Sequence, residues 1–306
     1  MNDIIIHEVG MRDGLQMEKQ IVALEKKIEW IESLIASGVD IIQIGSFVRP
    51  DKVPQMADTE QLFQHLARME QLDTKPMFSA LILNEKGLER GLACGVEMFC
   101  MGVSASETHS KKNTGMSIAE ATERILSIAK LIEGTGKKVQ VSVQSAFGCG
   151  YEGYVPQERV MRIVEEYLNA GLRNISLADT AGHATPGQVE KMFSAVLECD
   201  SSIECACHFH DTYGLALANC YAAMRVGVRS FESSIAGLGG CPFTKIAGGN
   251  TCTEDFVHML QRMDLRDDIS LDRLISIGND VSIFFGREMP GTIYKVGAIA
   301  QREFVN

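Results

Sequence analysis

The chain alternates short apolar, β-branched runs with longer segments in which apolar residues recur every three or four positions. The short runs predict eight strands, over residues 4–9, 39–45, 77–83, 98–103, 139–144, 174–178, 203–208 and 230–235. The longer segments predict helices between them, for example over residues 20–36. Strands that alternate with helices are typical of a parallel sheet built from βα units.

No Pro-, Ser- or charge-rich linker interrupts the eight βα units, which favours one closed domain over two open sheets. We therefore predict an α/β fold, a (β/α)8 TIM barrel over residues 1–250 with a C-terminal helical extension over residues 251–306. The extension is expected to pack on the barrel within a single structural unit. Thr251 and Glu254 form a capping-box pattern at the start of its first helix.

Composition narrows the range of partners. The 306 residues carry a formal charge of −11, which disfavours nucleic acid or an anionic membrane as the main partner. An anionic small-molecule substrate would therefore need a local positive site. The nine cysteines are scattered, and we see neither a signal-peptide pattern nor a long apolar run, so we expect a cytoplasmic protein with reduced thiols.

Polar side chains near the C-terminal ends of the strands are the candidate functional residues, because barrel enzymes build their active sites there. They are Arg12 and Asp13 after the first strand, Gln43 on the second, His208 and His210 at the end of the seventh, and the Gly-rich loop 237–250 after the eighth.

His208 and His210 share one face of their strand, whereas the two cysteines before them point to the other face. This alternation argues against a Cys/His zinc cluster. Asp13 and Asn250 are the best-placed oxygen donors, and a set of two imidazoles, a carboxylate and an amide suits Mg²⁺ or Mn²⁺. The alternatives are that the histidines only cap a strand by hydrogen bonds and that residues 248–250 form a plain turn.

Arg12 and Cys241 are candidates for direct chemical roles. The planar guanidinium of Arg12 suits the neutralisation of a developing oxyanion, although a surface ion pair with Asp13 is the simpler alternative. Cys241 lies on the Gly-rich loop, where a thiol is suited to proton transfer or nucleophilic attack. A lone cysteine is otherwise most often a small buried apolar residue.

At these residues the sequence resembles the 3-hydroxy-3-methylglutaryl-CoA lyase family of metal-dependent (β/α)8 enzymes, over residues 4 to about 265. The matching segments are EVGMRDGLQ (8–16), SFV (46–48), VPQM (53–56), YEG (151–153), HFHDTYG (208–214), SIAGLGGCPF (234–243) and GN (249–250).

The resemblance implies that Asp13, His208, His210 and Asn250 bind a divalent cation. It further implies that Arg12 polarises the substrate and that Cys241 is catalytic. The implied reaction is the cleavage of a tertiary 3-hydroxyacyl-CoA to acetyl-CoA and a keto acid, with His208 or Cys241 moving the protons.

Substrate binding is assigned to Arg12, to Gln16 in the first motif, to Gln43, and to Lys111 and Lys112. Because the CoA group is anionic, these two lysines are candidates for binding it. Lys52 and Lys245 are further candidates, and ordinary solvated surface lysines are the alternative for each.

Gln43 departs from the family pattern, which carries a catalytic glutamate at this position. A neutral amide cannot act as a base or as an anionic partner of Arg12. Reduced activity, compensation by a neighbouring group, and a different substrate are the possible consequences. We favour a different substrate, since Gln43 removes a negative charge that would repel a carboxylate on the carbinol carbon, as in citramalyl-CoA.

Two other functions stay open at this point. One is a metal-dependent aldolase acting on a free 4-hydroxy-2-keto acid, although such aldolases lack the loop with Cys241. The other is a metal- or CoA-binding pseudoenzyme. Family habit and the C-terminal helices predict a homodimer.

Overall fold

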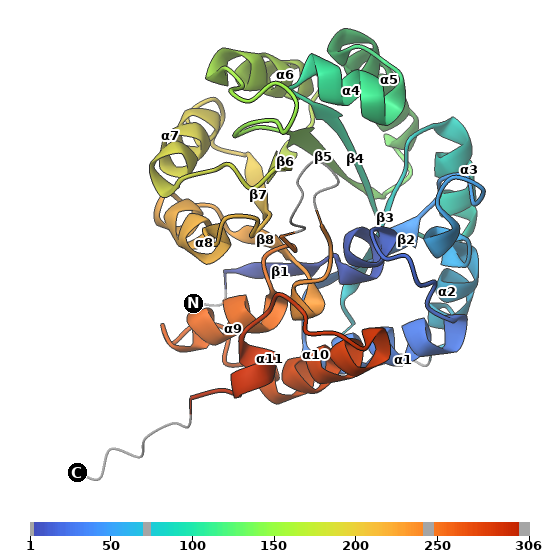
Figure 1. The fold of residues 1–306 in the computed structure, drawn as a ribbon. Helices are drawn as coiled ribbons and strands as arrows, with labels where there is room; N and C mark the ends of the chain where they lie inside the picture. The colour runs from blue at the N-terminus through green and yellow to red at the C-terminus, as the bar shows by residue number, and fades with distance from the viewer. Residues whose placement is uncertain (1–2, 70–74, 241–247, 300–306) are drawn as a thin grey trace.

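Eight parallel strands close into a barrel in chain order, and helices surround it (Figure 1). The computed structural model describes residues 3–69, 75–240 and 248–299. The predicted TIM barrel is confirmed. The strands are β1 (Ile5–Glu8), β2 (Ile41–Ser46), β3 (Met77–Leu81), β4 (Met98–Ser104), β5 (Lys138–Gln144), β6 (Asn174–Asp179), β7 (Glu204–Phe209) and β8 (Ser230–Ser233).

Helices follow the strands and form the outer layer of the barrel. They are α1 (Leu24–Ser37), α2 (Thr59–Leu66), α3 (Glu85–Ala93), α4 (Glu107–Thr114), α5 (Ile118–Ile132), α6 (Gln157–Asn169), α7 (Pro186–Leu197), α8 (Ala216–Arg225), α9 (Thr253–Gln261), α10 (Leu271–Phe285) and α11 (Ile293–Val296). Short helical turns lie at Gly10–Gly14 (η1), Pro54–Met56 (η2) and Ile235–Gly237 (η3). Among the described helices, none is both long and apolar enough to cross a membrane.

The predicted strands all exist, and each end lies within two residues of its predicted position. The predicted helix over residues 20–36 starts later, at Leu24, because Ala23 is still extended. Ile21 lies outside this helix and is largely exposed. An apolar residue in the right period was therefore not part of the helix.

Strand β5 shows how the barrel separates an apolar layer from a polar interior. Val141 and Val143 are fully buried in the hydrophobic core. Gln140, Ser142 and Gln144 alternate with them and line a cavity inside the barrel. The strand therefore contributes both to stability and to a polar wall.

The C-terminal helices pack on the barrel beside α1 (Figure 1). The indole of Trp30 on α1 contacts Phe284 with ring centroids 5.4 Å apart, and its Nε1 donates to Asp280 at 2.6 Å. The capping box predicted for Thr251 and Glu254 is wrong. Helix α9 starts only at residue 253, because the Thr251 hydroxyl donates to the barrel strand at the Phe209 carbonyl, at 3.1 Å.

Candidate active site

Arg12 and Asp13 lie in the π-helical turn η1, directly after β1. The amide of Asp13 donates to the Val9 carbonyl at 2.7 Å, which holds the turn against the end of the strand. The Arg12 guanidinium donates both to the Asp13 carboxylate and to the Gln43 carbonyl oxygen. The two side chains are mostly buried, with 13% and 21% exposed, so the surface ion pair considered above is excluded.

Asp13, His208 and His210 converge at the mouth of the barrel. One ligand atom of each lies within 4.8 Å of the other two. The two Nε2 atoms of the histidines are 3.2 Å apart, and His208 Nε2 is 3.9 Å from Asp13 Oδ2. Three residues far apart in the chain thus form a possible metal-binding triad.

Asn250 adjoins this triad. Its Nδ2 donates to Asp13 Oδ2 at 2.9 Å and to the Leu238 carbonyl at 3.0 Å. Its Oδ1 is buried and has no hydrogen-bond partner in the described part of the chain. An unpaired amide oxygen beside a carboxylate and two imidazoles fits a divalent cation, since a cation would satisfy that oxygen.

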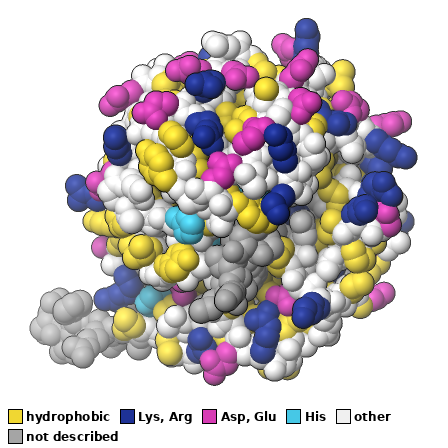
Figure 2. Space-filling model, turned by 45° about the horizontal axis from the view of Figure 1, so that its top comes forward, with side chains coloured by type: hydrophobic (Ala, Val, Ile, Leu, Met, Phe, Trp, Pro, Cys, Tyr) yellow, Lys and Arg dark blue, Asp and Glu magenta, His cyan; other side chains and the backbone are white. Residues whose placement is uncertain are grey.

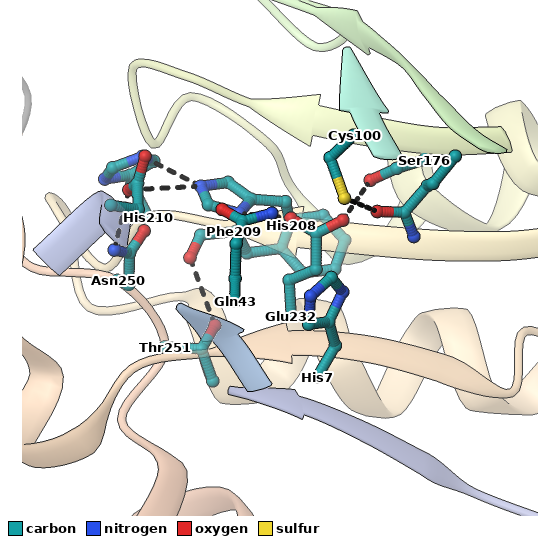
Figure 3. A network of polar contacts seen from close by, with 12 residues as sticks. His7, Gln43, Cys100, Ser176, His208, Phe209, His210, Glu232, Asn250 and Thr251 are labelled. Atoms are coloured by element: carbon teal, nitrogen blue, oxygen red, sulfur yellow. Dashed lines mark hydrogen bonds and ion pairs between the residues drawn. The ribbon is translucent and has the colours of Figure 1, made fainter. Parts of the chain in front are cut away.

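Glu232 on β8 contacts the nitrogen of His208 that faces away from Asp13 and His210 (Figure 3). Its Oε2 lies 2.9 Å from His208 Nδ1, and its Oε1 accepts from the Ser176 hydroxyl at 2.8 Å. A carboxylate on one imidazole nitrogen leaves the other nitrogen free to bind metal. The sequence analysis missed Glu232; the available signal was a charged residue in the middle of a short predicted strand.

The charges of the triad shift its titration. Burial disfavours the charged form of Asp13, but Arg12 and both histidines hold its pKa well below the ordinary range. Burial likewise works against a charge on His208, yet the hydrogen bond and charge of Glu232 raise its pKa. Burial and the neighbouring His208 lower the pKa of His210 to about 4. Asp13 is therefore ionised and His210 neutral at pH 7, which are the forms of these two side chains that bind a metal.

A cavity of about 590 Å³ opens next to the triad. Its lining includes the following predicted site residues: Arg12, Asp13, Gln16, Gln43, Lys52, His208 and His210. Lys111 and Lys112 do not line it; Lys111 pairs with Glu107 at 3.2 Å, and Lys112 lies over the Tyr151 ring. The face shown in Figure 2 mixes basic and acidic side chains around its periphery. Cys241 and Lys245 lie outside the described residues.

Two buried carboxylates anchor the start of the Gly-rich loop, and the sequence analysis assigned neither of them this role. Glu8 accepts from the Ile235 amide at 3.0 Å, and Glu254 accepts from the Ala236 amide at 2.9 Å. Ala236 has a positive φ of 56°, which L-residues seldom adopt. Burial raises the pKa of Glu8 to about 7 and that of Glu254 to about 8. These contacts hold the strained turn η3 from which the loop departs.

Comparison with known proteins agrees with this geometry. The HMGL-like family model matches residues 3–281. A hydroxymethylglutaryl-CoA lyase of Bacillus subtilis is 38% identical over 94% of this chain and 95% of its own length. An (R)-citramalyl-CoA lyase of Chloroflexus aurantiacus is 35% identical over 98% of this chain and 96% of its own.

A solved structure is similar to this chain over almost its whole length. The HMG-CoA lyase from Acinetobacter baumannii, in complex with coenzyme A and 3-methylmalate, aligns with a TM-score of 0.91 at 36% identity. The alignment covers 98% of this chain and 97% of that one. The family resemblance found in the sequence is therefore confirmed, and the chain belongs to the HMGL-like family.

Proposed function

We propose that this protein is a divalent-metal-dependent acyl-CoA lyase. It cleaves 3-hydroxy-3-methylglutaryl-CoA, or a close analogue, to acetyl-CoA and a keto acid, which is acetoacetate for the parent substrate. The observation that carries the proposal is the convergence of Asp13, His208 and His210 beside Arg12, where all four side chains border one cavity. The family membership supports a carbon–carbon lyase.

The reaction needs a base, a site for negative charge and an acid. The carbinol hydroxyl loses its proton, the carbon–carbon bond breaks, and the electron pair moves into the thioester as an enolate. A proton then returns to the enolate carbon, which yields acetyl-CoA. A bound Mg²⁺ or Mn²⁺, held by Asp13, His208, His210 and Asn250, would act as a Lewis acid on the hydroxyl.

Arg12 is suited to bind the enolate oxygen, because its guanidinium borders the cavity and is held by Asp13 and Gln43. His208 is poorly suited to move protons. Its Nδ1 is engaged by Glu232, and its Nε2 faces the other two members of the triad. We therefore assign the proton transfers to Cys241, on chemical grounds alone.

The test is turnover of purified protein with 3-hydroxy-3-methylglutaryl-CoA, followed by acetyl-CoA release. We expect activity with Mg²⁺ or Mn²⁺ that EDTA abolishes, and at least about a hundredfold loss of kcat in Asp13→Asn and Cys241→Ala. An exposed cysteine far from the cavity provides the control, as Cys199→Ala. Absence of turnover with every tertiary 3-hydroxyacyl-CoA tried would instead leave a metal- or CoA-binding module.

Citramalyl-CoA is the second candidate substrate. Gln43 is neutral and gives Arg12 only a carbonyl oxygen, so a carboxylate on the carbinol carbon meets less repulsion there than beside a glutamate. We expect Gln43→Glu to lower kcat/KM for citramalyl-CoA at least about tenfold more than kcat/KM for 3-hydroxy-3-methylglutaryl-CoA. Equal losses for both thioesters would exclude this role of Gln43.

The proposed assembly is a homodimer. It is supported by large apolar side chains exposed on the C-terminal helices, Ile283 on α10 and Val296 on α11. Sedimentation velocity tests this directly, and a monomer at micromolar concentration would contradict it.

A further inference from the structure

Glu8 is the last residue of β1 and is fully buried, yet it does not line the active-site cavity in the part of the chain that the structure describes. Its Oε1 accepts from two backbone amides, that of Gly10 at 2.7 Å and that of Ile235 at 3.0 Å. Its Oε2 accepts from the Thr253 hydroxyl. Gly10 begins turn η1 and Ile235 begins turn η3, so one carboxylate joins two turns that are far apart in the chain.

Turn η1 also packs directly on η3 and the residues that flank it. A Cβ added at Gly10 would lie 3.0 Å from Ser234 Oγ, and one added at Gly14 would lie 2.7 Å from Leu238 Cβ. Neither glycine has a positive φ, so the close packing, and not the turn itself, requires glycine at these two positions. The carboxylate of Glu8 therefore joins two turns that are already in close contact.

Three of the four proposed metal ligands are held together without η1. His208 and His210 lie at the end of β7, and the backbone of Asn250 pairs with that of His210 in an isolated bridge. The Asp211 amide extends this pairing by donating to the Gly249 carbonyl at 2.8 Å. These three ligands therefore form one group, whose position is set by β7 and the segment paired with its end.

Asp13 lies outside this group, on η1 beyond the end of β1. Its Oδ2 accepts from Asn250 Nδ2 at 2.9 Å, and the same Nδ2 donates at 3.0 Å to the carbonyl of Leu238, which directly follows η3. The position of Asp13 relative to Asn250 therefore depends on how η1 lies against η3. Glu8 holds these two turns together.

We propose that Glu8 is a positioning residue, which joins η1 to η3 and thereby holds Asp13 against the other three proposed metal ligands. The inference rests on the proposed metal-dependent lyase function and concerns the selection of the metal. A fixed set of ligands favours Mg²⁺ over Ca²⁺, because Mg²⁺ demands near-ideal octahedral geometry whereas Ca²⁺ tolerates variable geometry and longer bonds. Release of Asp13 should therefore weaken Mg²⁺ binding more than Ca²⁺ binding.

The test is titration calorimetry of the metal-free, full-length protein with Mg²⁺ and with Ca²⁺, in the absence of substrate. Glu8→Met keeps an unbranched side chain of similar length but removes both acceptor oxygens. We expect the affinity for Mg²⁺ to fall at least about tenfold and that for Ca²⁺ to fall less, so that the preference for Mg²⁺ narrows.

Glu8→Gln separates the hydrogen bonds of this side chain from its charge. Its Oε1 can still accept from the Gly10 and Ile235 amides, and its Nε2 can donate to the Thr253 hydroxyl. We therefore expect Glu8→Gln to keep the wild-type preference for Mg²⁺. A loss as large as that in Glu8→Met would mean that the charge of Glu8 acts on the cation directly, which overturns the positioning role.

Gly14→Ala tests the same contact if Glu8→Met does not fold. The added Cβ meets the Leu238 side chain and should displace η1 from η3, with the same narrowing of the preference for Mg²⁺. Gly187→Ala on α7 is its matched control, since nothing lies within 4 Å of the added Cβ. It should bind both ions as the wild type does.

The outcomes separate this inference from the proposed function. Wild-type affinities for both ions in Glu8→Met, or in Gly14→Ala if only that variant folds, would overturn the inference but leave the lyase function intact. A wild-type protein that binds neither ion and cleaves no thioester would overturn both.

Discussion

Glu232 lies 2.9 Å from His208 Nδ1 and 2.8 Å from the Ser176 hydroxyl, so one carboxylate joins two strands of the barrel to the proposed metal site. The contact determines which nitrogen of His208 is free. Because the free Nε2 faces Asp13 and His210, the orientation of a single ring controls the whole triad.

Replacing this carboxylate by an amide should weaken metal binding. In Glu232→Gln the His208 ring loses its anionic acceptor, and we expect Mn²⁺ affinity to fall about 10- to 100-fold. Titration calorimetry with Mn²⁺ on metal-free protein measures this. Glu204→Gln at the exposed start of β7 removes the same charge without touching the site and should bind Mn²⁺ normally. Unchanged affinity in Glu232→Gln would show that the contact does not orient a ligand.

At the scale of elements, the Gly-rich loop is held where its two ends meet. A Cβ added at Gly249 would lie 1.7 Å from the Gly237 carbonyl oxygen, and one at Gly248 would lie 2.1 Å from the Thr212 backbone. These glycines are needed because of close backbone approach. A plain turn over residues 248–250, the alternative considered in the sequence analysis, does not account for these close approaches, because they join segments that are distant in the chain.

Gly249→Ala should therefore displace the neighbouring Asn250. We expect kcat/KM to fall at least about tenfold and the free energy of unfolding to fall by about 1–3 kcal/mol. Steady-state kinetics and urea denaturation measure the two effects. Gly187→Ala on α7 is the matched control, since nothing lies within 4 Å of its added Cβ. If both variants behave like the wild type, the loop ends tolerate separation.

Across the whole molecule, the C-terminal extension is joined to the barrel through α1 and α10. Trp30 is the single tryptophan of the chain, so its fluorescence reports on this junction alone. The Asp280 carboxylate accepts from the Trp30 indole and also pairs with Lys26, whose Nζ lies 2.6 Å from it. Arg266 pairs with Asp40 at 2.6 Å, which ties the segment between α9 and α10 to the start of β2.

Such a junction predicts one cooperative unfolding transition. In urea, Trp30 fluorescence and far-ultraviolet circular dichroism should have the same midpoint. Asp280→Ala removes the acceptor of the indole and should lower stability by about 1 kcal/mol, while Asp280→Asn keeps an acceptor and should lose less. A fluorescence transition at lower urea than the dichroism transition would mean that α10 detaches first.

The order and type of the elements followed from the sequence. Each strand is a short run whose apolar residues pack against the helix layer, and each covering helix repeats its apolar residues with a period near 3.6. The triad residues also followed, since strand ends of a barrel meet at one mouth and His208 and His210 share a face. The local sequence pattern did not predict where helices α1 and α9 begin. Ile21 matches the helical period outside the helix, and Glu254 binds the Ala236 amide instead of capping α9.

Tertiary structure alone decided which side chains face one another across the barrel. No spacing in the chain relates Glu232 to His208 or Ser176. Hydrophobic periodicity is a local property that a single segment expresses. The ionisation of a buried group and the charge of a cavity are sums over neighbours from many strands, and those neighbours exist only after the barrel has closed.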